Sequence, residues 1–278
     1  MMRPPEGLKI LAPPKRGFIV PRLRVAPSEL DRIEVIPLRG IPEVSKGDDL
    51  AALILEAVSK SSLALDDGDV VVVKHKIVSK AEGRVVRLGS VAPRRRAKAL
   101  AKSQGKDPRL VELVLAESVR VVRAGHGVII TETRQGFVCA NSGIDQSNVG
   151  RGSVALLPVD PDRSADKLRR ELEKRTGKAL AVVVTDTFGR PWRLGQTDVA
   201  IGCSGVLPLV DYAGRRDKFG YELRVTEPSV VDEVAGAAEL AIGKLKGIPA
   251  AIVRGVEYVR GEEGVKGMLM PAERDLFR

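Results

Sequence analysis

The sequence predicts a mixed α+β fold. Apolar runs of strand length are interspersed with helical patterns, two of the strands read as a hairpin over 128–140, and no regular strand–helix–strand rhythm repeats along the chain. The chain has 278 residues, of which 44% are hydrophobic, so it can bury a full core as one large domain or as two lobes. These observations favour α+β over a doubly wound α/β sheet.

The first half of the chain opens with a segment rich in proline and basic residues. Residues 1–32 show little periodicity, so we expect an extension there and a single domain over 33–278. The elements expected next are a strand at 33–37, a helix at 49–60 capped by Asp48-Asp49, a buried strand at 70–73 that continues as extended chain towards Lys80, and a helical block at 93–117.

The second half of the chain contains the hairpin and most of the remaining apolar strands. The hairpin strands are joined through Arg134-Gln135-Gly136, a polar segment that contains a glycine. The expected elements are strands at 128–131 and 136–140, a short strand at 154–158, a helix from Ser164 to about Thr176, an apolar strand at 179–185 that ends at Asp186, a helix at 228–244 and a strand at 250–253.

Composition excludes several classes of protein. No apolar run approaches the roughly 18–20 residues that a membrane span needs, and the first residues lack the apolar region of a signal peptide. Cys139 and Cys203 each stand alone in an apolar context, which indicates reduced core residues of a cytoplasmic protein. With only two histidines, a histidine-rich zinc site is not expected.

The net charge of +10 calls for an anionic partner or a solvated surface. Its densest run lies over 94–109, where arginines and lysines recur at helical spacing with alanines between them. A solvated helix face is the first interpretation, and attraction of phosphorylated substrates is the second. Aromatic residues make up only 3% of the chain, so we do not expect nucleic-acid binding.

The only two asparagines, Asn141 and Asn148, fall within one eight-residue stretch, and the chain is otherwise poor in amides and rich in charge, as in thermophiles. An amide offers both a donor and an acceptor without charge, and Asp145 between them is a hard oxygen ligand. The loop at 141–151 is therefore a candidate metal–nucleotide site. The alternative is a loop that merely needs residues tolerant of left-handed backbone.

A second acidic group follows the apolar strand at 179–185. Asp186 and Thr187 can ligate a cation, and Arg190 and Arg193 can clamp a carboxylate or phosphate through two parallel hydrogen bonds. Polar residues at the mouth of a buried strand often face a site, because the scaffold fixes them. With the first loop, this motif predicts a site for a metal and a nucleotide.

Two weaker motifs complete the set. Lys80 precedes a loop that contains Gly83, and it is either a phosphate contact or a surface lysine. The segment 195–205 contains Gly195, Gly202 and Gly205, which allow either a close approach of the backbone to a ligand or tight packing within a sheet.

Together, these blocks resemble the coenzyme F-420:L-glutamate ligase family, and the match runs from about Ile33 to Phe277. The family-like segments are Leu38-Arg39-Gly40-Ile41-Pro42, Val78–Arg84, Gly143–Val149, Thr185–Arg190, Gly195–Asp198 and Val225-Thr226-Glu227. The residues in these segments are closer to those of the bacterial branch, in which a nitroreductase-like domain often follows. The chain stops at Arg278, so that second domain is not expected.

The resemblance implies an α+β fold with two lobes, assembled as an intertwined homodimer. It also implies use of GTP with two Mg²⁺ or Mn²⁺ ions and K⁺. By position, the metal ligands would be Asp145, Asp186 and Thr187, and the GTP contacts would be Ile41, Pro42, Glu43, Val44, His75, Lys80 and Asn148.

Two positions depart from the family pattern. His75 stands where the family has a serine that contacts the nucleotide, and Gly243-Lys244-Leu245 stands where the archaeal branch has an acidic metal ligand. The contact at His75 and the ligand near Lys244 are therefore open.

The implied reaction is ligation of L-glutamate, γ-linked, to the deazaflavin precursor coenzyme F-420-0. A carboxylate must be activated before an amine can attack it, and phosphoryl transfer from GTP would give an acyl phosphate. Asp145 and Asp186 would act in catalysis through the metals. We infer from their chemistry that Arg190 or Arg193 would hold the carboxylates. The alternatives are an amide ligase with another anionic acceptor and a basic nucleic-acid-binding protein.

Overall fold

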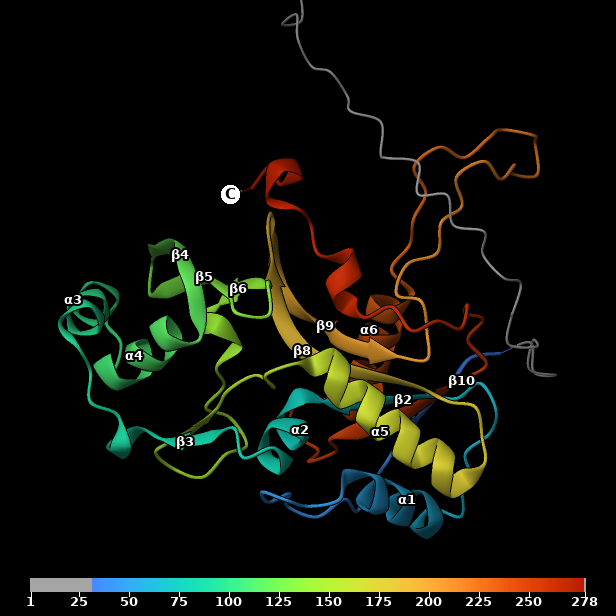
Figure 1. Ribbon diagram of the computed structural model, residues 1–278, viewed down its shortest axis with the longest axis horizontal. Helices are drawn as coiled ribbons and strands as arrows, with labels where there is room; N and C mark the ends of the chain where they lie inside the picture. Colours follow the sequence, from blue (N-terminus) through green and yellow to red (C-terminus); the bar gives the residue numbers. More distant parts are fainter. Residues whose placement is uncertain (1–31, 278) are drawn as a thin grey trace, which may run out of the picture.

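A computed structural model describes residues 32–277, and the predicted extension at 1–32 lies outside the described residues except for Arg32 (Figure 1). The helices and strands are β1 (Glu34–Pro37), α1 (Leu50–Lys60), β2 (Val70–Lys74), α2 (His75–Ala81), β3 (Val85–Arg87), α3 (Arg95–Gln104), α4 (Pro108–Ala116), β4 (Ser118–Gly125), β5 (Val128–Thr133), β6 (Val138–Ala140), β7 (Ser153–Ala155), α5 (Pro161–Thr176), β8 (Ala181–Arg190), β9 (Arg193–Ser204), α6 (Val230–Ile242) and β10 (Ala250–Arg254).

A five-stranded mixed sheet in the order β1-β10-β2-β8-β9 forms the centre of the molecule. Only β2 and β8 are parallel neighbours, with Val70 paired to Ala181 and Lys74 paired to Thr185. The residues 70–73 and 182–184 are at most 1% exposed, as expected for strands covered on both faces. The carboxyl end of β2 therefore lies beside Thr185, midway along β8.

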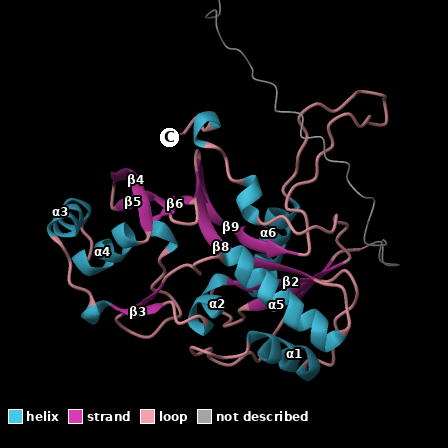
Figure 2. Cartoon of the chain, viewed as in Figure 1, coloured by secondary structure: helices cyan, strands magenta, loops and turns pink. Residues whose placement is uncertain are grey.

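Two helices cover opposite faces of this sheet. Helix α5 begins at its N-cap Asp160 and ends at Gly177 in left-handed backbone, and it packs against β8 and β9. Helix α6 begins at its N-cap Ser229 and packs against β9 and β10 on the other face. Figure 2 shows α1 beside α5, where Arg175 joins the two helices through an ion pair to Asp49.

A smaller unit carries a second apolar cluster. Strands β4, β5 and β6 form an antiparallel sheet against α3 and α4, with Ala97, Ala101, Val111, Val114 and Ile129 buried between them. The short β3–β7 ladder lies between this unit and the central sheet (Figure 1). The predicted α+β class and the hairpin over 128–140 are both confirmed.

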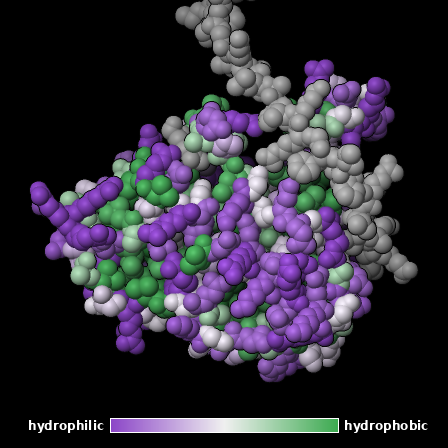
Figure 3. Space-filling view, in the orientation of Figure 1, coloured by the Kyte–Doolittle hydropathy of each residue, from purple (hydrophilic) through white to green (hydrophobic). Residues whose placement is uncertain are grey.

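The surface differs between these parts. In Figure 3 polar residues cover the face formed by α5 and α1, whereas apolar residues gather over the smaller unit. There Val119, Val128 and Val138 are exposed to 67%, 42% and 38%. No helix within residues 32–277 is both long and apolar enough to cross a membrane.

Three sequence-based expectations are wrong in ways that affect the site. The segment 75–81 is the helix α2 rather than extended chain, because burial of Ile77, Val78 and Lys80 outweighs the modest helix propensity of β-branched residues. The apolar strand does not end at Asp186 but continues to Arg190, paired with β9. The cap of α5 is Asp160 rather than Ser164.

The helical block at 93–117 is two helices, which are separated at Gly105, a residue with left-handed backbone. Strand β4 was not predicted, because its charged outward residues and two register shifts hide the alternation of a strand. Cys139 and Cys203 are buried and unpaired, as expected, and burial raises the pKa of each thiol to about 12.

The glycines of 195–205 serve close packing at two positions. A Cβ on Gly202 would lie 2.4 Å from the backbone of Pro161 in α5, and one on Gly205 would lie 2.6 Å from the Leu180 carbonyl oxygen. Around Gly195 there is open space. Tight packing therefore accounts for Gly202, and tight packing together with a φ of +80° accounts for Gly205. Gly195 has a φ of +86°, which favours glycine without any close contact.

We expect Gly202→Ala to lower the free energy of unfolding by about 1–3 kcal/mol, because α5 must move away from β9 to admit the methyl group. Gly189→Ala, in the same hairpin, meets no atom within 4 Å and should change stability by less than about 0.5 kcal/mol. Chemical denaturation of both variants measures the difference. Equal stabilities would show that the β9–α5 contact is not tight in solution.

Candidate functional site

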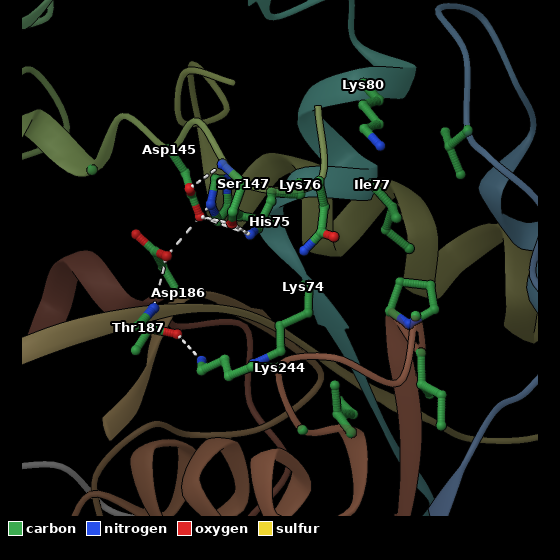
Figure 4. A pocket seen from close by; sticks show the side chains of 18 of the residues that line it. Lys74, His75, Lys76, Ile77, Lys80, Asp145, Ser147, Asp186, Thr187 and Lys244 are labelled. Carbon is green, nitrogen blue, oxygen red and sulfur yellow. Dashed lines mark hydrogen bonds and ion pairs between the residues drawn. The ribbon is translucent and has the colours of Figure 1, made fainter. Parts of the chain in front are cut away.

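A cavity of about 640 Å³ opens where β2 ends beside the middle of β8 (Figure 4). Loops and helices from distant parts of the chain surround it. Its lining comprises Ile41, Pro42, Glu43, Val44, Lys74, His75, Lys76, Ile77, Lys80, Ala140, Asn141, Gly143, Ile144, Asp145, Ser147, Asn148, Asp186, Thr187, Phe188, Gly189, Gln196, Ile242, Gly243, Lys244, Gly247, Ile248 and Pro249.

Lysines from three parts of the chain line this cavity. Lys74 is the last residue of β2, and α2 begins at the next residue, so the chain turns at the sheet edge and places Lys76 and Lys80 on the cavity wall. Lys244 follows α6 and approaches from the opposite side (Figure 4). Such a group of ammonium ions suits a polyanionic ligand.

Asp145 is held by one of these lysines. Lys76 Nζ lies 2.7 Å from Asp145 Oδ2, and the Ser147 backbone N–H donates to Asp145 Oδ1 at 2.7 Å. Burial acts to raise the pKa of Asp145, but the Lys76 ammonium and the Ser147 donors leave it below its usual value. Asp145 is therefore ionised at neutral pH.

Asp186 and His75 form a buried pair. His75 is 1% exposed, and its Nε2 lies 3.4 Å from Asp186 Oδ1, while Nδ1 lies 3.3 Å from Ser79 Oγ. Burial lowers the pKa of His75 although Asp186 opposes the shift. Burial also raises the pKa of Asp186, and the nearby charge of Asp145 adds to that rise.

Asp145 and Asp186 are suited to sharing a divalent cation. Mg²⁺ typically takes one or two protein carboxylates and completes its shell with phosphate oxygens and water. A cation between the two groups would offset both the burial of Asp186 and its repulsion by Asp145. Within 32–277, no group of three or more His, Cys, Asp or Glu side chains is arranged to hold a metal.

The side chain of Thr187 has a different environment. Successive residues of a strand point to opposite faces, so Thr187 points away from Asp186. Its hydroxyl donates to Asp198 Oδ1 at 2.7 Å and accepts from Lys244 Nζ at 2.6 Å (Figure 4). A cation between Asp145 and Asp186 therefore does not share its site with the Thr187 hydroxyl.

The far end of the cavity is formed by the loop 41–44 and by α2. Lys80 is 9% exposed, and its Nζ lies 2.5 Å from Glu43 Oε1. It is a partly buried cation on a helix, not a surface lysine at a strand end. Asn141 and Asn148 both line the cavity and both have left-handed backbone, with φ of 52° and 54°, so the backbone requirement accounts for part of the choice of asparagine.

The structure brings every predicted site residue to this cavity except Arg190 and Arg193. Arg190 is exposed at the tip of the β8–β9 hairpin and does not line the cavity, because β8 runs on past Asp186 instead of turning there. The expected role of Arg190 in holding a carboxylate is therefore not supported. The basic side chains of α3, in the smaller unit, also lie outside the cavity lining.

Sequence reasoning missed the lysines on either side of His75 and the partners of Lys74. Lys74 donates hydrogen bonds to Asp198 and Glu239, which come from β9 and α6. The basic triplet directly after an apolar strand was the available signal, since the end of a buried parallel strand commonly faces a site. No sequence pattern links it to β9 or α6.

A family model described as F420-0:gamma-glutamyl ligase matches residues 40–255, which include every residue of the cavity lining. The chain belongs to the F420-0:gamma-glutamyl ligase family. This confirms the resemblance inferred from the motifs. The closer likeness to the bacterial branch of the family stays a prediction.

Three relatives from archaea match this chain over nearly the whole of their own length. The coenzyme F420:L-glutamate ligase of Methanothermobacter thermautotrophicus is 47% identical over 249 residues, which cover 88% of this chain and 99% of the relative. That of Methanopyrus kandleri is 46% identical, covering 89% and 97%. That of Methanocaldococcus jannaschii is 41% identical, covering 90% and 98%.

The buried His75 should make stability depend on pH. The pKa of His75 is lowered in the folded state. Below about pH 6.5 the unfolded chain therefore binds a proton that the folded chain does not, and the free energy of unfolding decreases as the pH decreases. Between pH 7.5 and pH 5.5, chemical denaturation should show that the free energy of unfolding of the wild type decreases more than that of His75→Ser. The difference should be up to about 1.4 kcal/mol. Parallel pH profiles of the two proteins would contradict a neutral, buried His75.

Proposed function

We propose that this protein is a GTP-dependent ligase that adds L-glutamate, through a γ-linkage, to the deazaflavin coenzyme F420-0. Membership of the family and the names of its relatives support the reaction class and the acceptor. The observation that carries the proposal is the meeting of Asp145 and Asp186 in a cavity that lysines surround. Ligation through an acyl phosphate needs such a place for a nucleotide, a divalent cation and two carboxylates.

The cavity offers separate regions for the parts of GTP. The loop Ile41–Val44 and Asn148 would contact the nucleotide, and Lys80 would contact a phosphate after leaving Glu43. Asp145 and Asp186 would hold Mg²⁺ or Mn²⁺ against the phosphates. When bound, the ion neutralises phosphate charge and favours in-line transfer of the terminal phosphoryl group. We also propose that K⁺ supports the reaction, as the family resemblance implies.

The proposed reaction has two steps, phosphoryl transfer and then attack by the amine. A carboxylate oxygen of the acceptor attacks the γ-phosphorus of GTP, the bond to the bridging oxygen breaks, and GDP leaves. The amine nitrogen of L-glutamate attacks the carbonyl carbon of the acyl phosphate, and inorganic phosphate leaves with the electron pair while the amine loses a proton. Lys76 and Lys244 line the cavity, so their ammonium groups stabilise the anionic groups during both steps.

Mass spectrometry of coenzyme F420-0 after incubation with the full chain, GTP, Mn²⁺ and L-glutamate tests the proposal. We expect the mass of added glutamyl units and release of GDP, and parallel reactions with ATP and with other anionic acceptors test both specificities. GDP and product with another acceptor but none with coenzyme F420-0 would show a different amide ligase. No nucleotide-dependent product with any acceptor would contradict the ligase proposal.

Removing either proposed metal ligand should abolish ligation without unfolding the protein. We expect Asp145→Ala and Asp186→Ala to lower kcat/KM by about 10²-fold or more, because phosphate charge is left uncovered. Glu171→Ala, which removes a carboxylate from the solvent side of α5, is the matched control and should retain activity. Near wild-type turnover of either aspartate variant at saturating Mn²⁺ would refute that metal assignment.

We further propose that the protein acts as a homodimer. Large apolar side chains are exposed on two projections, the tip of the β8–β9 hairpin and the segment 208–229, which is drawn in orange and extends from the body in Figure 1. Leu194 is 100% exposed, and Phe219 and Val225 are 84% and 82% exposed. Trp192 is 87% exposed, and its ring lies tilted against that of Phe277, with ring centroids 5.6 Å apart. Exposed groups of this kind mark a surface that a second copy can cover.

Light scattering at low micromolar concentration should therefore give the mass of a dimer, and Leu194→Asp with Phe219→Asp should shift it towards a monomer. Val159→Asp is the control, because Val159 is also 70% exposed but lies outside both projections. An active wild-type monomer at that concentration would overturn the dimer.

A further inference from the structure

Four charged side chains form a closed ring at the α6 side of the cavity. Lys74 donates to both Asp198 and Glu239, and Lys244 Nζ lies 2.8 Å from Glu239 Oε1 and 3.4 Å from Asp198 Oδ1. Each carboxylate thus lies between the same two ammonium groups. Two positive and two negative charges balance within the ring.

This ring is partly shielded from water. The Asp198 side chain is 1% exposed, and Glu239 and Lys74 are 18% and 13% exposed. Burial acts to raise the pKa of Asp198, but hydrogen bonds from Lys74 and Thr187 and the charge of Lys244 leave it lowered. The contacts of Lys244 are therefore stronger than those of an exposed surface pair.

The oxygens around Lys244 are those that a cation would use. Thr187 Oγ1, Asp198 Oδ1 and Glu239 Oε1 converge on its ammonium group at 2.6, 3.4 and 2.8 Å. They are hard oxygen donors from β8, β9 and α6, at the wall of the cavity. A metal ion in the same place would displace Lys244 and would still lie beside Lys74.

The two carboxylates Asp145 and Asp186 fit one divalent ion, but the Lys244 ammonium group lies where a second ion beside Thr187 would bind. We propose that the ammonium group of Lys244 takes the place of a second metal ion beside Thr187, so that the protein uses one divalent ion per site. The positive charge is then tethered to the chain and needs no binding from solution. Only one part of this inference rests on the proposed function, namely that the ammonium group of Lys244 faces a phosphate of the nucleotide.

Counting bound Mn²⁺ tests the inference without nucleotide or acceptor. The full-length wild type, Lys244→Ala, Lys246→Ala and the double variant Lys244→Ala/Glu239→Gln are titrated with Mn²⁺ in tetramethylammonium buffer, and free Mn²⁺ is measured by electron paramagnetic resonance. Lys246 is the matched control, because it lies in the same loop but its ammonium contacts only the Ala241 carbonyl oxygen at 3.1 Å. Lys244 is half exposed, so its replacement leaves the core intact.

We expect Lys244→Ala to bind about one more Mn²⁺ per chain than the wild type, because the vacated oxygens then carry excess negative charge. Lys246→Ala should match the wild type, and the double variant should lose the gain. Equal stoichiometry in Lys244→Ala and the wild type, or a gain that survives Glu239→Gln, would overturn the inference. Failure of ligation in the wild type would contradict the proposed function and leave this comparison of stoichiometries intact.

Discussion

The parallel pairing of β2 with β8 is the constraint on which the rest of the site depends. The two strands are buried on both faces, so their register is fixed by the core and not by the polar residues beyond it. That register sets Lys74 beside Thr185, and it brings the start of α2 to the next residues of β8. His75 and Asp186 meet for this reason, although 110 positions separate them in the sequence. The site is therefore a consequence of how valine-rich strands pack.

Charge balance is the second organising feature of the cavity. Each lysine at the wall has a carboxylate partner, as Lys76 has Asp145 and Lys80 has Glu43. Unpaired charges this close to the core would be costly, so each ion pair offsets the cost of burying its lysine and its carboxylate. Binding of the proposed phosphate ligand with a divalent ion would offer each group a new partner of opposite sign. The lysines would then contact phosphate, and the aspartates would contact the metal.

Several residues of the site could be predicted from the sequence, but the tertiary contacts that bring them together could not. Asp145, Asp186 and Lys80 stand in local motifs, so their presence in one site could be predicted from chemistry and family resemblance. The course of the chain around them could not, because Ile77 and Val78 have strand-like side chains and become helical only through burial against the sheet. Arg190 was misplaced for a related reason, since pairing with β9 carries β8 beyond Asp186. The ring of Lys74 and Lys244 joins four segments, and no local pattern encodes it.

The central claim is that the cavity at the end of β2 is a metal–nucleotide site. Crystallography with Mn²⁺ and a non-hydrolysable GTP analogue tests it most directly. Anomalous scattering at the manganese edge locates the ion independently of the nucleotide. The account predicts a manganese peak between Asp145 and Asp186, with the triphosphate beside Lys76 and Lys80. A nucleotide bound elsewhere, or manganese that contacts neither aspartate, would contradict it.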